Sequence, residues 1–146
     1  MTRHAATSYV LVGLALAGSV TLQVVPSAFA SPVGECEAAT SNQIEAGQCL
    51  RDTLGAAEQV LGIGLSSAQL KADAIDQIAG RSGARLALDQ SQALWLQFRD
   101  SNCAVPGTFA AGGSGSGQFI ISCQIEMTRA RSAALEALAG GRAGGD

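Results

Sequence analysis

The four cysteines of this chain constrain its fold more than any other feature. They lie at Cys36, Cys49, Cys103 and Cys123 in a sequence of 146 residues. An even number of cysteines in an exported chain predicts two disulfides, which fix neighbouring elements to one another. Zinc binding is disfavoured, because the cysteines form no Cys-x-x-Cys pair and the chain has a single histidine, His4.

Residues 1–30 predict a signal peptide rather than part of the fold. A positive residue, Arg3, precedes the apolar run 9–17, and Ala28-Phe29-Ala30 fits a signal-peptidase site. The alternative is an N-terminal membrane anchor, for which the apolar run is short. We therefore expect cleavage after Ala30, a mature chain without membrane attachment, and a periplasmic or secreted location.

Composition narrows the classes of function. The sequence has 12 acidic and 9 basic residues, for a formal net charge of −3, which gives no basic patch for nucleic acid. His4 lies in the predicted leader, so the mature chain has no histidine for Ser-His or Cys-His catalysis or for metal binding. No paired acids stand in a catalytic context either. We expect no cofactor, no metal and no enzymatic activity.

The apolar spacing predicts an all-α chain. After Leu50, apolar residues recur every three or four positions and so share one helix face. They are Leu54, Ala57, Leu61, Leu65, Ala68, Ala72, Ile75 and Ala79. Gly62-Ile63-Gly64 weakens this helix, since each glycine costs about 1 kcal/mol relative to alanine. The face keeps its phase through the glycines, so we favour one long helix that bends there; a break within residues 62–66 is the alternative.

Glycine and proline predict where the other elements begin and end. Residues 31–35 are expected to be loose, and Thr40 or Ser41 to cap a short helical turn through Cys49. Gly80-Arg81-Ser82-Gly83 ends the long helix. The next helix is expected to begin at residues 84–86 and to end near residue 102.

Pro106 and Gly107 are expected to open a loop, residues 106–118, that contains a flexible Gly-Ser run. Helical spacing then predicts a last helix over residues 119–138, followed by a disordered tail at 140–146. The residues with this spacing are Ile121, Ile125, Thr128, Ser132, Leu135 and Leu138.

These elements predict a disulfide-stapled antiparallel three-helix bundle with a short N-terminal helical turn, formed by residues 31–139. Short connections place Cys49, Cys103 and Cys123 at one end, so geometry alone does not choose the pairing. We favour Cys36 with Cys49 and Cys103 with Cys123, because each bond closes a local loop. A Cys49–Cys103 bond is the alternative.

A motif around the third cysteine resembles a known family. The matching strings are Cys49-x4-Leu54-x2-Ala57-Glu58-x2-Leu61-Gly62-x2-Leu65, Leu88-x3-Gln92-x2-Trp95-x3-Arg99-Asp100-x2-Cys103, Gly112-Gly113-Ser114, Cys123, and Thr128-x2-Arg131-x3-Leu135. They resemble the LprI-like family, small exported bacterial domains named for a mycobacterial lysozyme inhibitor. Members often carry Asp, Asn and Tyr where this chain has Glu58, Gly62 and Leu65.

The resemblance covers residues 36–138 and implies a protein-binding module. Its partner would be a lysozyme or another peptidoglycan-cleaving enzyme, and its action would include inhibition. The alternative is an envelope-associated structural or stress protein with no enzyme target. A fold does not determine a function, so the two remain distinct hypotheses.

The motif residues favour structural roles. Trp95, the only tryptophan, is expected in the core. Arg99 and Asp100 diverge by roughly 100° on a helix, so we do not expect them to pair. Arg99 is expected to reach carbonyls at the end of its helix. Asp100 is expected to hold a helix N-terminus or an arginine, either Arg129 or Arg131.

The loop 106–118 is the candidate partner-binding element, because stapled loops on rigid scaffolds are common recognition sites; the alternative is a plain surface connection. Phe109 is its expected anchor, together with Gly112, Gly113 and Ser114. Four further acids are expected on solvated helix faces: Asp73, Asp76, Glu126 and Glu136.

Overall fold

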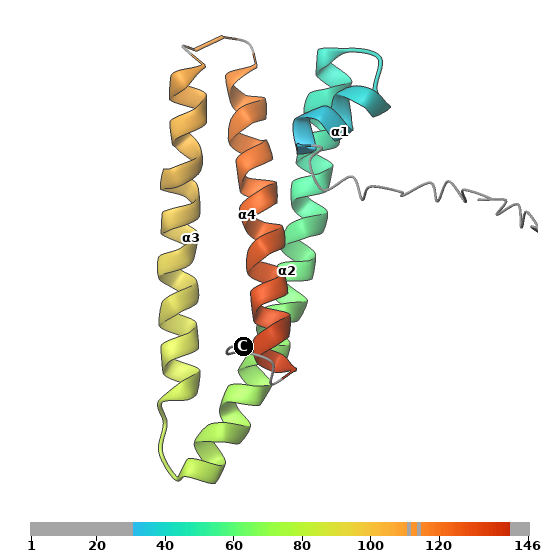
Figure 1. The fold of residues 1–146 in the computed structure, drawn as a ribbon. Helices are drawn as coiled ribbons and strands as arrows, with labels where there is room; N and C mark the ends of the chain where they lie inside the picture. Colours follow the sequence, from blue (N-terminus) through green and yellow to red (C-terminus); the bar gives the residue numbers. More distant parts are fainter. Residues whose placement is uncertain (1–30, 111, 114, 141–146) are drawn as a thin grey trace, which may run out of the picture.

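The computed structural model describes residues 31–110, 112–113 and 115–140, which form four helices and no strand (Figure 1). The helices are α1 (Pro32–Ala39), α2 (Gln43–Ala79), α3 (Ala84–Phe109) and α4 (Ser116–Ala139). The predicted leader and residues 141–146 of the predicted tail lie outside the described residues. Within them, no helix is both long and apolar enough to cross a bilayer.

Helix α1 contradicts the expectation of a loose segment at residues 31–35. The Ser31 Oγ accepts a hydrogen bond from the Gly34 N–H at 3.3 Å, which caps the helix. Pro32 follows at the first helical position, where its fixed φ and missing N–H cost nothing. Ser-Pro is therefore a helix-start signal here.

Helix α2 begins earlier than the spacing from Leu50 predicts, and neither Thr40 nor Ser41 caps it. The N-cap is Asn42, whose Oδ1 accepts from the N–H groups of Ile44 and Glu45, each at 3.1 Å. The Glu45 carboxylate reaches back to the Ser41 N–H at 2.9 Å. The Asn42 bonds satisfy donors that the first turn of the helix leaves free, and the Glu45 bond holds the residue before the cap.

The long helix runs without a break through residues 62–66, as the phase of its apolar face predicts. The Ser66 and Ser67 hydroxyls, which could have capped a new helix, bond back to the carbonyls of Gly62 and Ile63 at 2.9 and 3.1 Å. Gly64 is buried against Leu135 and the Ser132 carbonyl of α4. Helix α2 ends where expected, at Gly80 in the left-handed conformation with φ of 64°.

Helix α3 corrects the expected loop boundary, because it continues through Pro106 to Phe109. Cys103 is joined to α4 in this stretch, and Gly107 lies against Ile120 so closely that an added Cβ would be 2.6 Å from its side chain. These contacts hold the last turns of α3 on α4. The connection between the two helices therefore spans residues 110–115 and not 106–118.

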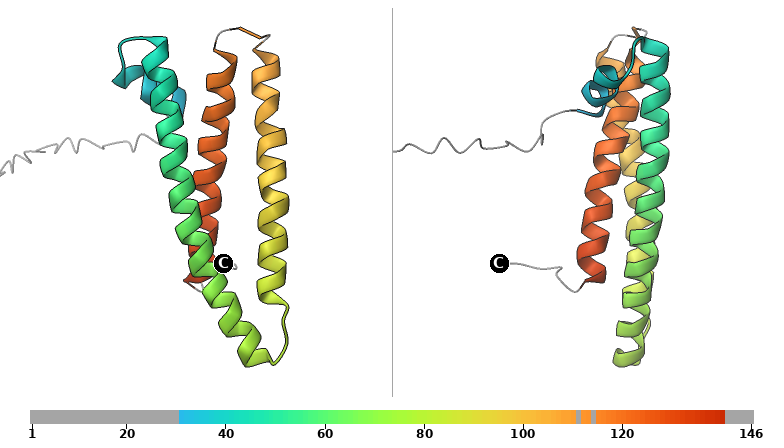
Figure 2. Two further views of the ribbon diagram at one scale, coloured as in Figure 1. Left: turned by 180° about the vertical axis from the view of Figure 1, so that it is seen from behind. Right: turned by 90° about the vertical axis from the view of Figure 1, so that its right-hand side faces the viewer.

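The three long helices lie side by side, with α2 and α4 running in one direction and α3 in the other (Figures 1 and 2). Helix α4 packs on both α2 and α3, and α1 lies against α2 and α4 at one end. Among the described residues, the core has two clusters. One is Cys36, Leu50 and Ile125; the other is Leu61, Ala68 and Leu135.

Candidate functional site

Three motif residues of α3, Gln92, Trp95 and Arg99, lie on the side that packs against α2 and α4, whereas Asp100 is exposed. Gln92 and Arg99 are buried, with 6% and 7% of their surface exposed. The Arg99 Nη1 donates to the Glu58 Oε1 of α2 at 3.0 Å and to the Thr128 Oγ1 of α4 at 3.2 Å. One guanidinium thus contacts three helices, and it bonds side chains rather than the helix-end carbonyls that were expected.

The adjacent pair Arg99 and Asp100 forms an ion pair, contrary to the sequence prediction. The Arg99 Nε lies 3.0 Å from the Asp100 Oδ1, which also accepts from Gln124 at 3.4 Å. The two Cα–Cβ bonds diverge, but the arginine side chain is long enough to return to its neighbour. Asp100 therefore binds neither Arg129 nor Arg131, which pair with Glu35 and Gln92 respectively.

Trp95 is partly buried and lies beside two guanidinium groups. The Cζ atoms of Arg99 and Arg131 are 5.6 and 5.8 Å from the centre of its ring, within the range of cation–π attraction. Arg131 also donates to Gln92 at 3.0 Å and to Ser91 at 3.2 Å. Burial lowers the pKa of the Arg131 guanidinium from its ordinary value.

This network is built to join helices rather than to transfer protons. No buried side-chain nitrogen or oxygen of the described residues lacks a hydrogen-bond partner. The two carboxylates that could act chemically, on Glu58 and Asp100, both bind the Arg99 guanidinium. The described residues also contain no group of His, Cys, Asp and Glu that could hold a metal ion.

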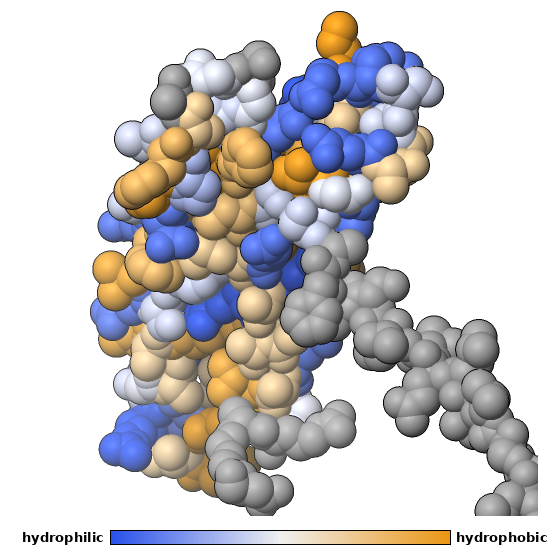
Figure 3. Space-filling model, turned by 45° about the horizontal axis from the view of Figure 1, so that its top comes forward, coloured by the Kyte–Doolittle hydropathy of each residue, from blue (hydrophilic) through white to orange (hydrophobic). Residues whose placement is uncertain are grey.

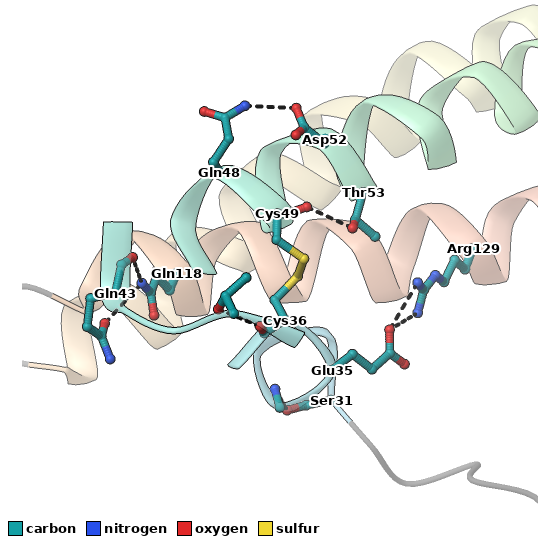
Figure 4. Close-up of a disulfide and its surroundings, with 12 residues drawn as sticks. Ser31, Glu35, Cys36, Gln43, Gln48, Cys49, Asp52, Thr53, Gln118 and Arg129 are labelled. Carbon is teal, nitrogen blue, oxygen red and sulfur yellow. Dashed lines mark hydrogen bonds and ion pairs between the residues drawn. A yellow bond between two sulfur atoms is a disulfide. The ribbon is translucent and has the colours of Figure 1, made fainter. Parts of the chain in front are cut away.

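The four cysteines form a second candidate site at one end of the molecule, which we call the disulfide end. Cys36–Cys49 joins α1 to α2 with Cα atoms 5.7 Å apart, and Cys103–Cys123 joins α3 to α4 with Cα atoms 5.4 Å apart. This is the favoured pairing, and the Cys49–Cys103 alternative is wrong. Side chains add to the bonds: Gln118 of α4 donates to Gln43 of α2 at 3.2 and 3.1 Å (Figure 4).

Large apolar side chains are exposed at the disulfide end. Phe109, at the end of α3, is 85% exposed, and Ile44, at the start of α2, is 83% exposed. Val105 and Phe119 nearby are about half exposed, at 50% and 49%. With this end brought forward, Figure 3 shows separate hydrophobic areas among hydrophilic ones. Phe109 was predicted from the sequence as a candidate anchor, but Ile44, which precedes the periodic run from which α2 was predicted, was not.

The connection that follows Phe109 is shorter than predicted. Gly112 adopts a positive φ of 70°, which favours glycine, and Gly113 is exposed. Ser114, the remaining predicted loop residue, lies outside the described residues. An open polar depression of about 350 Å³ lies at this end between α1 and α2, lined by Glu37, Thr40, Ser41, Asn42, Gln43 and Ala46.

Two acids expected to be merely solvated instead organise the opposite end, where α2 turns into α3. Asp76 accepts from the N–H groups of Gly83, Ala84 and Arg85 at 3.0, 2.8 and 3.0 Å. The bond from Ala84 is the main reason that the pKa of Asp76 lies below its usual value. Asp73 pairs with Arg85 at 2.9 Å.

The comparisons with known proteins identify a family and a distant relative. The family described as "Lysozyme inhibitor LprI" matches residues 36–135. An uncharacterized protein of Rhizobium meliloti (strain 1021) is 38% identical over 60 residues, which are 41% of this chain and 43% of that protein. The match therefore covers less than half of that relative's length. No solved structure matches. Because the family match covers well over half of the sequence, the chain belongs to the lysozyme inhibitor LprI family.

Proposed function

We propose that this chain is an exported protein-binding module that binds a peptidoglycan-cleaving enzyme, such as a lysozyme, through its disulfide end. The observation that carries the proposal is the exposure of Phe109 and Ile44, 85% and 83%, at an end held by two disulfides. Apolar anchors on a cross-linked scaffold lose little conformational freedom when they bind. Membership of a family described as lysozyme inhibitors supports this choice of partner.

The charge of the α1–α2 corner supports a basic partner. Residues 31–52 contain the acids Glu35, Glu37, Glu45 and Asp52 against one base, Arg51. An acidic surface draws a basic enzyme toward it and raises the association rate. The proposed contact therefore combines two apolar anchors with an acidic surround.

The rest of the proposal concerns location and mode of action. Two disulfides favour an oxidising compartment, so the module is periplasmic or secreted after removal of residues 1–30. An antiparallel three-helix bundle is the rigid body that carries the disulfide end. The chain acts by binding and not by catalysis, because Arg99 and Asp100 are engaged in a network that joins helices.

A cell-lysis assay tests this function. The protein, purified after export from a bacterial host, is added to bacterial cells and several lysozyme types, and the fall in turbidity is followed. We expect inhibition at micromolar concentration. Phe109→Asp and Ile44→Asp should each raise the half-inhibitory concentration at least about tenfold, as for anchors that dominate an interface.

Leu94→Asp is the matched control. Leu94 is 66% exposed but lies on α3 fifteen residues before Phe109, which is about 22 Å along the helix. We expect this variant to inhibit like the unaltered protein. If no lysozyme type is inhibited, the proposed function is wrong, and an envelope-associated structural or stress protein is favoured.

A further inference from the structure

Helix α2 has an apolar face that points away from the other helices, which we call the outer face. Its residues follow one another at intervals of three and four: Ala56, Val60, Ile63, Ser67, Leu70, Ala74 and Ile78. All seven are exposed, and the four large ones reach 47% at Val60, 68% at Ile63, 73% at Leu70 and 89% at Ile78. No described residue covers this row.

Within the part of α2 that carries the outer face, the carboxylates are directed away from that face. Between residues 54 and 79 the carboxylates are Glu58, Asp73 and Asp76. Each contacts α3: Glu58 binds Arg99, Asp73 binds Arg85, and Asp76 caps the helix. Lys71 is the remaining charge of this stretch and lies at the edge of the row. An acidic chain thus carries a long helix face free of carboxylates.

We propose that the outer face of α2 is a self-association surface, on which the α2 helix of a second copy packs antiparallel about a two-fold axis. The row from Ala56 to Ile78 extends about 33 Å, enough for three heptads of helix-on-helix packing. A two-fold pairing uses the same surface twice, so one self-complementary face is sufficient.

Charge selects a second copy over other occupants. Two chains of the same net charge, −3, meet here without opposing carboxylates. A basic enzyme would be attracted to the acidic corner at the disulfide end instead. A membrane surface needs several basic residues beside the apolar face, and this face has Lys71 alone.

The sizes of the side chains select an antiparallel register. With the axis near residue 65, Val60 faces Leu70 of the second copy, and Ile63 faces Ser67. Ile63 then opposes the small Ser67 on both sides of the axis, instead of a second Ile63 as in a parallel pairing, which lets the two helices approach closely there. The two helix dipoles oppose one another, and the acidic disulfide ends point in opposite directions. Both ends stay free for the enzyme partner, so this inference is independent of the proposed function.

Sedimentation equilibrium of the protein purified after export tests the proposal. We expect dimers at micromolar concentration, and Ile63→Glu should weaken dimerisation at least about tenfold, because two carboxylates would be brought together inside the contact. Leu94→Glu is the matched control, since Leu94 on α3 is 66% exposed against 68% for Ile63. It should dimerise like the unaltered protein, and circular dichroism should show both variants equally helical.

Cysteine cross-linking tests the register. Ser66→Cys, near the proposed axis, should form a bond between copies under mild oxidation, whereas Ile78→Cys should not. A monomer at every concentration would overturn the proposal, as would a dimer unaffected by Ile63→Glu or equally weakened by Leu94→Glu. Cross-linking through Ile78→Cys would overturn the antiparallel arrangement. A monomer that binds lipid vesicles through Ile63 would assign the face to a membrane instead.

Discussion

At the scale of single residues, Arg99 joins the three long helices through one side chain. Its side chain is 8% exposed, yet it bonds Glu58 on α2, Asp100 on its own helix and Thr128 on α4. A buried guanidinium needs such partners, because its desolvation is costly when it is left unpaired. The two carboxylates are about half exposed, which keeps them hydrated and moderates the strength of the network.

Replacement of Arg99 should therefore destabilise the fold substantially. Arg99→Met keeps the length of the side chain but removes every bond of the guanidinium, so we expect a loss of about 2–3 kcal/mol. Urea unfolding, monitored by circular dichroism, measures this loss of unfolding free energy. Arg129→Met is the control, because its ion pair with Glu35 is exposed and should contribute less than about 1 kcal/mol. An equal loss of stability in Arg99→Met and Arg129→Met would contradict the claim that the buried Arg99 network stabilises the fold more than an exposed ion pair does.

Two glycines should respond in opposite directions to the same change. A Cβ at Gly107 would lie 2.6 Å from the Ile120 side chain, whereas nothing lies within 4 Å of one at Gly62. We expect Gly107→Ala to destabilise by about 1–3 kcal/mol through overpacking. Gly62→Ala should stabilise by up to about 1 kcal/mol, because alanine favours the helix interior. The melting temperatures of the two variants distinguish these outcomes. Stabilisation by both changes would contradict the close contact between α3 and α4 at Gly107.

At the scale of elements, α3 depends on α2 for its first turn. The N-cap position is Gly83, which has no side chain, and the free N–H groups at the start of the helix bond instead to Asp76 near the end of α2. A carboxylate in this position also interacts favourably with the positive end of the helix dipole. One side chain therefore starts α3 and fixes the turn between the two helices.

This cap predicts a specific dependence on pH. The pKa of Asp76 in the folded state lies below the ordinary 3.8, so the carboxylate's contribution is present above that value and is lost as the pH falls through the lowered pKa. Asp76→Ala should be less stable than the unaltered protein at pH 7, and the difference should shrink below about pH 4. Melting temperatures between pH 7 and pH 2.5 measure the difference.

Asp52→Ala provides the comparison. Its exposed carboxylate bonds Gln48 on the surface of the same helix (Figure 4), so the change should alter stability little at pH 7. A difference between Asp76→Ala and the unaltered protein that stayed constant down to pH 2.5 would show that the cap does not act through its ionised form.

At the scale of the whole molecule, the two ends are held by different means. The disulfide end has two covalent bonds and the cluster of Cys36, Leu50 and Ile125. The other end is held by Asp76 and the Arg85 ion pairs. Packing is looser there, with an open apolar groove of about 140 Å³ between α2, α3 and Leu138. Resistance to local opening should therefore decrease from the disulfide end toward the turn between α2 and α3.

Hydrogen exchange should reveal this difference. We expect backbone amides of residues 74–90 to exchange faster than helical amides around Leu50 and Ile125, since no cross-link limits small openings at the end that holds residues 74–90. Mass spectrometry of peptides from the native protein measures both regions. Reduction of the disulfides should bring the exchange rates of the two regions closer together. Equal exchange rates in the oxidised protein would contradict the predicted difference between the two ends.

Local patterns predicted the helices well, and long-range contacts explain the errors. The phase of the apolar face correctly carried α2 through Gly62 and Gly64. The prediction that the helix ends near residue 102 and that Pro106 opens a loop is wrong, because this local signal is overridden by the Cys103 bond and by the Gly107–Ile120 contact. The cap by Asp76 joins residues across a turn, which spacing along one helix does not reveal. Ser31-Pro32, by contrast, was a readable start signal that the prediction missed.

Each disulfide joins helices that are consecutive along the chain, and this has a consequence for the integrity of the protein. The segment 80–83 is the one covalent connection, among the described residues, between the α1–α2 hairpin and the α3–α4 hairpin. Cleavage there would yield a two-chain complex whose halves are each cross-linked and are held together by noncovalent contacts alone, including the Arg99–Glu58 ion pair. Such halves could be produced from separate genes, reassembled and exchanged between molecules, which makes this small protein a natural candidate for split-fragment complementation.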